Sequence, residues 1–190
     1  MGGEISASLL LRIGGLAVAL VFVQVGVISE VPVLGVTIDV SPLAVAFVGL
    51  LCGSTLGAVT GFAVGLLMDL MLVQTLGVTS LVFTVIGYWA GRLRELRDPQ
   101  AALTPVLVGA SAAASALVGY SVIEFLLGVD APVSFELLRQ IVLGILVDTL
   151  LALPLWLLVR RVLDPSLPDD PRRRRRRAYT TGGLSPLSRS

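Results

Sequence analysis

The chain has 190 residues, of which 55% are hydrophobic and 14% charged, and its mean hydropathy is +0.93. This balance excludes an ordinary soluble domain, because such domains carry about 25% charged residues. The sequence contains no histidine and no lysine, which excludes a histidine base, a common zinc site, a phosphate-loop lysine and a Schiff base.

No enzyme activity, metal or cofactor is therefore expected. The remaining chemical alternative is an intramembrane aspartyl enzyme, which would need its carboxylates to converge. Apolar runs of about the 20 residues that cross a bilayer dominate residues 1–163. We expect this region to be one transmembrane helical bundle, and residues 164–190 to be a disordered, arginine-rich cytoplasmic tail.

Residues 9–28 form the first predicted span. This run exceeds the roughly 7–15 residues of a signal-peptide core, and the residues that follow it lack a small-x-small cleavage pattern, so it is expected to remain in the protein. Residues 29–40 contain Glu30, Pro32, Gly35 and Asp39 and are predicted to be a loop or surface segment.

Residues 43–72 are apolar over a length between one span and two. Ser41 followed by Pro42 is typical of a helix N-cap and first turn. A turn at Gly53-Ser54-Thr55 would divide the run into helices at about 38–52 and 56–72. The alternative is a single long tilted helix, so the sequence allows five or six spans.

The fourth span is predicted at 77–91, and the polar segment 92–99 follows it. Thr104-Pro105 repeats the cap-then-proline pattern and starts a fifth span that ends near 127. After a loop at 128–134, the sixth span covers about 137–158 and contains Pro154, which is expected to bend it.

The arginines predict the orientation, because short loops rich in Lys or Arg stay in the cytoplasm. With six spans, all arginines except Arg139 fall on one side of the membrane. Trp89 and Trp156 then lie toward the cytoplasmic ends of their spans, where an indole suits the headgroup boundary. Six spans with both termini cytoplasmic is therefore the favoured topology.

Small residues recur at helical spacing in the third and fourth spans. In lipid such residues allow close backbone approach, which supplies packing energy. A straight helix turns the four-residue series by about 40° per step, so the whole series is not expected to face one straight neighbour. The choice between packing inside the bundle and an exposed partner face is left open. The candidate helix-packing residues are Gly53, Gly57, Gly61, Gly65, Gly77, Ser80, Thr84, Gly87 and Gly91.

The fifth span contains a further run of small residues at 109–116. Four ionisable residues also fall within predicted spans: Asp69, Glu124, Arg139 and Asp148. Charged groups at membrane depth are costly, so each is a candidate functional residue. Asp69, Glu124 and Arg139 are close to the outer helix ends and could be interfacial. Asp148 is deeper and is expected to face the protein interior.

The tail contains six consecutive cations: Arg172, Arg173, Arg174, Arg175, Arg176 and Arg177. Each could gain about 1 kcal/mol beside an anionic leaflet. Anionic lipid is the expected partner, with an acidic cytoplasmic protein as the alternative. Nucleic acid is not expected, because no folded basic surface accompanies the run.

The glycine-rich segment 57–70 ends in Leu-Leu-Met-Asp-Leu, and it is followed by Leu76-Gly77 and by Gly-Tyr-Trp-Ala-Gly-Arg at 87–92. This pattern resembles MreD, the rod shape-determining membrane protein family. The resemblance implies an inner-membrane partner of MreC in the elongation complex with MreB, RodA and a transpeptidase. It also implies a bundle similar to the substrate-binding subunits of energy-coupling-factor transporters.

The expected function is accordingly a non-enzymatic membrane scaffold that supports lateral peptidoglycan synthesis and cell shape. The alternative is the substrate-binding subunit of an energy-coupling-factor vitamin transporter. Such a subunit should gather polar and aromatic groups in an outward cavity, and the outer segments of this chain offer few aromatics.

Overall fold

A computed structural model describes residues 7–28, 39–73, 75–96, 104–126, 128 and 135–166, with side chains described for these residues except 27, 28, 95, 96, 123–126, 135–141 and 166. Within this part of the chain the regular structure is helical, which confirms the predicted all-α class. The α-helices are α1 (Ala7–Val23), α2 (Ser41–Cys52), α3 (Ser54–Met71), α4 (Val78–Leu96), α5 (Thr104–Leu126) and α6 (Phe135–Leu163); a π-helical turn, η1 (Gln24–Ile28), extends α1, and a 3-10 turn, η2 (Asp164–Ser166), follows α6.

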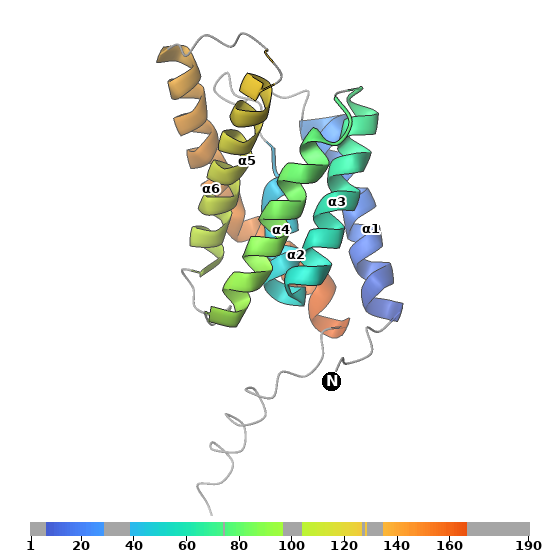
Figure 1. Ribbon diagram of the computed structural model, residues 1–190. Coiled ribbons are helices and arrows are strands. Elements are labelled where there is room, and N and C mark those ends of the chain that lie inside the picture. The colour runs from blue at the N-terminus through green and yellow to red at the C-terminus, as the bar shows by residue number, and fades with distance from the viewer. Residues whose placement is uncertain are drawn as a thin grey trace, which may run out of the picture.

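The helices form one bundle in which consecutive helices run in opposite directions (Figure 1). The start of α1 and the end of α6 therefore lie at the same end of the bundle. A hydrogen bond joins them there, because Nη1 of Arg12 donates to the Val162 carbonyl oxygen at 3.0 Å. Among the described residues, four helices, α1, α3, α5 and α6, are long and apolar enough to cross a membrane.

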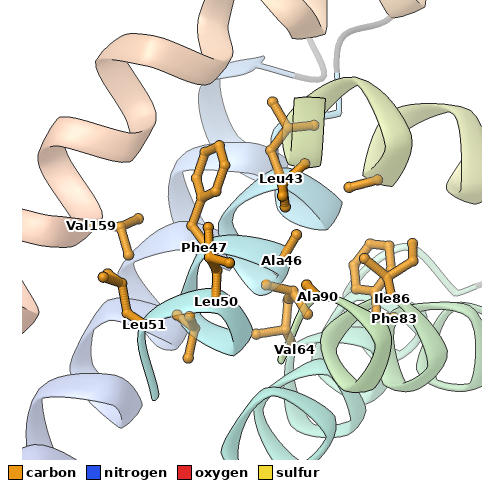
Figure 2. Close-up of a cluster of buried hydrophobic side chains, with 14 of the residues drawn as sticks. Leu43, Ala46, Phe47, Leu50, Leu51, Val64, Phe83, Ile86, Ala90 and Val159 are labelled. Atoms are coloured by element: carbon orange, nitrogen blue, oxygen red, sulfur yellow. The ribbon is translucent and has the colours of Figure 1, made fainter. Parts of the chain in front are cut away.

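Helix α2 lies at the centre of the bundle and contacts the other five helices. Each of its residues from Ser41 to Leu51 is buried. Figure 2 shows Leu43, Phe47 and Leu50 pointing from α2 into the surrounding apolar side chains. The ring of Phe47 meets Trp156 of α6 edge-on, with centroids 5.4 Å apart. A helix that is apolar on every side is suited to this fully enclosed position.

The predicted break at Gly53 is confirmed. Gly53 has φ +102°, a conformation that glycine adopts without the steric cost of a Cβ. Its N–H donates to Gly49 at 2.7 Å, and its carbonyl accepts from Gly57 at 2.9 Å. The chain therefore reverses between α2 and α3 within one residue, and the alternative of a single long tilted helix is wrong.

Three expectations about this region and its neighbours are corrected. Ser41 is the first residue of α2 rather than its N-cap, which is Val40. Val40 is buried, so the end of the predicted surface segment lies inside the bundle. Helix α4 continues beyond Gly91 to Leu96 because Arg92 and Arg94 can reach polar surroundings from its last turns.

Helix α6 continues past its predicted end at Leu158 to Leu163, with Pro154 inside it. At 12 residues, α2 is about 18 Å long, which is shorter than a bilayer core. The start of α2 therefore lies inside the bundle, below the end where α3 finishes and α4 begins (Figure 1).

Candidate functional site

The small residues of α3 lie against α4 along the length of the glycine series. A Cβ on Gly61 would overlap the Phe83 carbonyl, one on Gly57 would overlap the Gly87 carbonyl, and one on Gly65 would lie 2.5 Å from the Cα of Ser80. The two backbones therefore touch. Packing within the bundle, rather than an exposed partner face, accounts for these glycines.

We call this close backbone contact the α3–α4 seam. It continues to the opposite end of both helices. There a Cβ on Gly91 would overlap the backbone of Ser54, beside Gly53. The four-residue series was not expected to face one straight neighbour, and Gly57, Gly61 and Gly65 nevertheless all lie against α4. Since the series turns by about 40° per step on a straight helix, the two helices must curve around each other to stay in contact. The Thr84 hydroxyl lies on this stretch of α4 and donates to the Ser80 carbonyl at 2.6 Å.

Asp69 closes the seam at the end where α3 passes into α4. Its side chain is 1% exposed. Oδ2 accepts the N–H of Gly77 at 2.8 Å, and Oδ1 accepts the N–H of Thr79 at 3.3 Å. A carboxylate at a helix N-terminus satisfies unpaired amides and interacts favourably with the helix dipole.

Gly77 makes this cap possible because its φ is +97°, a value that a residue with a Cβ rarely adopts. The segment Leu-Leu-Met-Asp-Leu followed by Leu-Gly therefore acts as one structural unit. Its aspartate and glycine fix the chain direction between two helices whose backbones touch. Both carboxylate oxygens of Asp69 are occupied by this structural role.

A second polar region surrounds the start of α2. The Val40 N–H donates to Oε1 of Gln24 at 3.2 Å, and the Ser41 N–H donates to Oδ1 of Asp39 at 3.0 Å. Asp148 of α6 is buried, and its Oδ1 has no hydrogen-bond partner in the described part of the chain. Its interior position agrees with its predicted orientation.

Tyr120 of α5 lies near the same region. It is close enough to Thr79 for their side chains to interact and within electrostatic range of both Asp39 and Asp69. Asp39 in turn acts electrostatically on Asp148. The interior thus collects polar groups from η1, α3, α4, α5, α6 and the residues before α2.

Sequence reasoning missed Gln24, Asp39 and Ser41 as interior groups. Gln24 is a lone polar residue in an apolar run, which was the available signal. Two other predicted residues, Glu124 and Arg139, lie in α5 and α6, but their side chains are outside the described residues. The arginines at 172–177 are also outside them.

An open groove separates the lower parts of α4 and α5. It contains pockets of about 280 Å³ and about 90 Å³. Ser111 and Ser115 project from α5, and Trp89 and Leu93 from α4. Each serine hydroxyl donates to a carbonyl of its own helix, Ser111 to Val108 at 2.9 Å and Ser115 to Ser111 at 2.6 Å. The groove therefore offers small, internally satisfied side chains to a neighbour.

One end of the bundle carries the arginines whose side chains are described, and we call it the cationic end. Arg94 lies beside Gly53, and Arg160 pairs with Asp164 at 4.0 Å. The helix ends in Figure 1 place α1's start, α4's end and α6's end together there. The cationic end thus comprises Arg12, Arg92, Arg94, Arg160 and Arg161.

The sequence model of one family, described as rod shape-determining protein MreD, matches residues 11–162. The match spans the bundle from α1 to the last turn of α6. The chain belongs to the MreD family. It is a multi-pass membrane protein with a role in determining rod shape. No curated protein and no solved structure matches the chain.

The glycines and the aspartate on which the family resemblance rests lie in the contact between α3 and α4 or in the turn that joins these helices. The glycine-rich helix is the α3 side of the seam, Asp69 and Gly77 form the cap, and Gly87 and Gly91 belong to the α4 side. In this MreD-family chain the motif thus builds the α3–α4 pair. The groove on the other side of α4 shares Trp89 and Ala90 with that motif, and the rest of its lining comes from outside the motif.

Proposed function

We propose that this MreD-family chain is a non-enzymatic scaffold subunit of the rod complex in the bacterial inner membrane. It binds an MreC-like membrane protein and other elongation-complex members, and thereby supports lateral peptidoglycan synthesis and cell shape. The family match over residues 11–162 carries the proposal. A non-enzymatic role agrees with a chain that lacks histidine and lysine and whose Asp69 is fully used as a helix cap.

The α4–α5 groove is the proposed docking face for the partner's transmembrane helix. Lipid tails are as apolar as leucine, so helices associate in membranes through close packing rather than through a hydrophobic drive. The small side chains of Ser111 and Ser115 permit such an approach, and the adjoining pocket volume gives a partner side chain space. Trp89 is 62% exposed beside them and can contribute a large rigid contact area.

The test is copurification of an MreC-like partner from native membranes with the Ser111→Leu/Ser115→Leu double variant. We expect the partner to be lost while the melting temperature of the purified protein changes little, because both side chains point outward. The matched control is Ala63→Leu, a small-to-large change on the exposed face of α3. Undiminished copurification in the double variant would contradict this docking face.

The cationic end is proposed to face the cytoplasm, because arginine-rich short segments are retained there. Both termini would then be cytoplasmic, and the arginine tail would meet anionic lipid. Reporter fusions after Pro32, Arg94, Asp130 and Pro171 are expected to report outside, inside, outside and inside in turn. An outside signal at Arg94 would contradict the orientation.

The alternative function is vitamin binding for an energy-coupling-factor transporter. The polar groups around the start of α2 are the observation in its favour. Thermal unfolding with a panel of vitamins, run beside the partner copurification, separates the two functions. Stabilisation by one vitamin together with no recovered partner would favour the transporter subunit over the scaffold.

A further inference from the structure

Two buried side-chain oxygen atoms near the start of α2 have no hydrogen-bond partner in the described part of the chain. The Ser41 side chain is fully buried, its hydroxyl lies within reach of the Asp39 carboxylate, and its oxygen accepts no hydrogen bond in the described part of the chain. Asp148 is 6% exposed, and its Oδ1 is likewise unpartnered in the described part of the chain. Buried polar atoms are almost always satisfied, so two unsatisfied oxygens in one region point to a missing partner.

Among the described side chains, the charges in this region do not balance. Asp39 and Asp148 act on each other electrostatically, and in a low-dielectric interior two unneutralised carboxylates are strongly unfavourable. The N-terminus of α2 contributes roughly half a positive charge, which leaves a sum of about −1.5. The described arginine side chains lie at the cationic end, where Arg94 is beside Gly53, about 18 Å away along α2.

The chemistry of these groups limits what could bind. Asp39, Asp148 and Ser41 present only oxygen atoms, and oxygen ligands prefer hard cations such as alkali and alkaline-earth ions. In the described residues, no three histidine, cysteine, aspartate or glutamate side chains come together as a site for a metal ion. A multidentate carboxylate cage of the kind that holds a divalent ion is therefore missing there, whereas a single positive charge would offset most of the remaining negative charge.

We propose that an alkali-metal cation binds between Asp39, Ser41 and Asp148. The ion draws α6 toward the start of α2, because the two carboxylates belong to these separate parts of the chain. Gln24 supports the site from η1 by accepting the Val40 N–H, which holds the chain in position before α2. This inference does not depend on the scaffold function, since it rests only on the interior of the bundle.

The experiment uses the full-length protein in detergent, with thermal unfolding followed in sodium, potassium or choline chloride at constant ionic strength. Choline supplies the same ionic strength but is too large for the site. We expect a saturable rise in melting temperature of about 3 °C or more in one alkali salt relative to choline. Binding of radioactive sodium, or of rubidium as a potassium substitute, should saturate at one ion per chain.

Three variants assign the effect to the site. Asp148→Asn should abolish the cation dependence, Ser41→Ala should raise the cation concentration that gives half of the shift, and Asp164→Asn should leave the dependence intact, because its carboxylate is at the cationic end. Ser41→Ala removes only one oxygen, so it provides a test even if Asp148→Asn fails to fold.

Equal melting temperatures of the wild type in all three salts would overturn the proposal and indicate a carboxyl group that holds a proton instead. A cation dependence that persists unchanged in both Asp148→Asn and Ser41→Ala would also overturn it, because the ion would then bind elsewhere.

Discussion

Helix α4 packs against α3 on one side and against α5 on the other, and different atoms form the two contacts. Toward α3 the contact is backbone on backbone, as at Gly61 and the Phe83 carbonyl. Toward α5 the contact is made by side chains. The ring of Phe83 meets Tyr120 edge-on at 6.4 Å, and farther along the groove opens beside Ser111.

The two kinds of contact allow α4 to stabilise the fold on one side and to remain available for association on the other. Backbone contact leaves no space for another helix, and it maximises the dispersion energy that holds helices together in lipid. Side-chain contact with an adjoining groove leaves unused packing surface. The α3 side of α4 therefore stabilises the fold, and the α5 side is available to a partner.

The largest expected effect is from Gly65→Leu, which inserts a side chain where α3 touches the Ser80 backbone. Backbone atoms cannot move aside as a flexible side chain can, so we expect destabilisation of more than about 3 kcal/mol. The readout is the folded fraction and melting temperature in detergent. Gly14→Leu is the control, because a Cβ on Gly14 has no atom within 4 Å. Normal folding of Gly65→Leu would disprove that this contact is needed.

Asp69→Asn tests the cap at the end of the same seam. The amide group of asparagine would face an N–H donor with another donor, and the negative charge at the α4 N-terminus would be lost. We expect a loss of about 1–3 kcal/mol, seen as a lower melting temperature. Asp164→Asn should change it little, since its pair with Arg160 is partly exposed. If the two variants unfold alike, Asp69 is not a structural cap.

Much of the α3–α4 side could be predicted from the sequence. Glycine spacing indicated close packing, and Gly53 indicated the break. These features depend on residues near one another in the chain, so helix periodicity and turn chemistry are sufficient to find them. The series also indicated that no straight neighbour could face all of it, but the choice of α4 as that neighbour is a property of the pair of helices rather than of either one.

The interior around α2 could not be predicted in the same way. Asp39 follows a segment with Pro32 and Gly35, a composition typical of a surface loop. Ser41 before Pro42 had the pattern of an N-cap, but Asp39 and Gln24 accept the amides at the start of α2 instead. Gln24 is far from α2 in sequence, so only the tertiary structure reveals that it, rather than Ser41, caps an amide at the start of α2.

Gly77→Ala tests the contribution of the Gly77 backbone conformation to the Asp69 cap, separately from the hydrogen bonds that Asp69 accepts. A Cβ at this position meets no atom within 4 Å, so the cost comes from placing alanine at φ +97°. We expect destabilisation of about 1–2 kcal/mol, smaller than the effect of Gly65→Leu. Gly14→Ala, at an equally open helical position, should be neutral or slightly stabilising. Equal melting temperatures for the two alanine variants would show that the turn tolerates alanine.

The smallest effect is expected on the α5 side, where the same substitution can be compared directly across α4. A Cβ on Gly119 would lie 3.2 Å from the two methyl groups of Val82, whereas a Cβ on Gly61 would overlap the Phe83 carbonyl. Methyl groups can shift by a few tenths of an ångström, and alanine is favoured over glycine in a helix by about 1 kcal/mol. We therefore expect the stability of Gly119→Ala to be within about 0.5 kcal/mol of the wild type.

Gly61→Ala, by contrast, should lower the melting temperature clearly, because its clash is with a carbonyl oxygen held in the α4 backbone. Measuring both variants in the same detergent cancels any general effect of alanine on membrane helices. A double variant should show nearly additive changes, since the two sites lie on separate neighbours of α4. If Gly119→Ala were as destabilising as Gly61→Ala, both sides of α4 would be equally tight, and the α5 side would lose its distinction as the adaptable face.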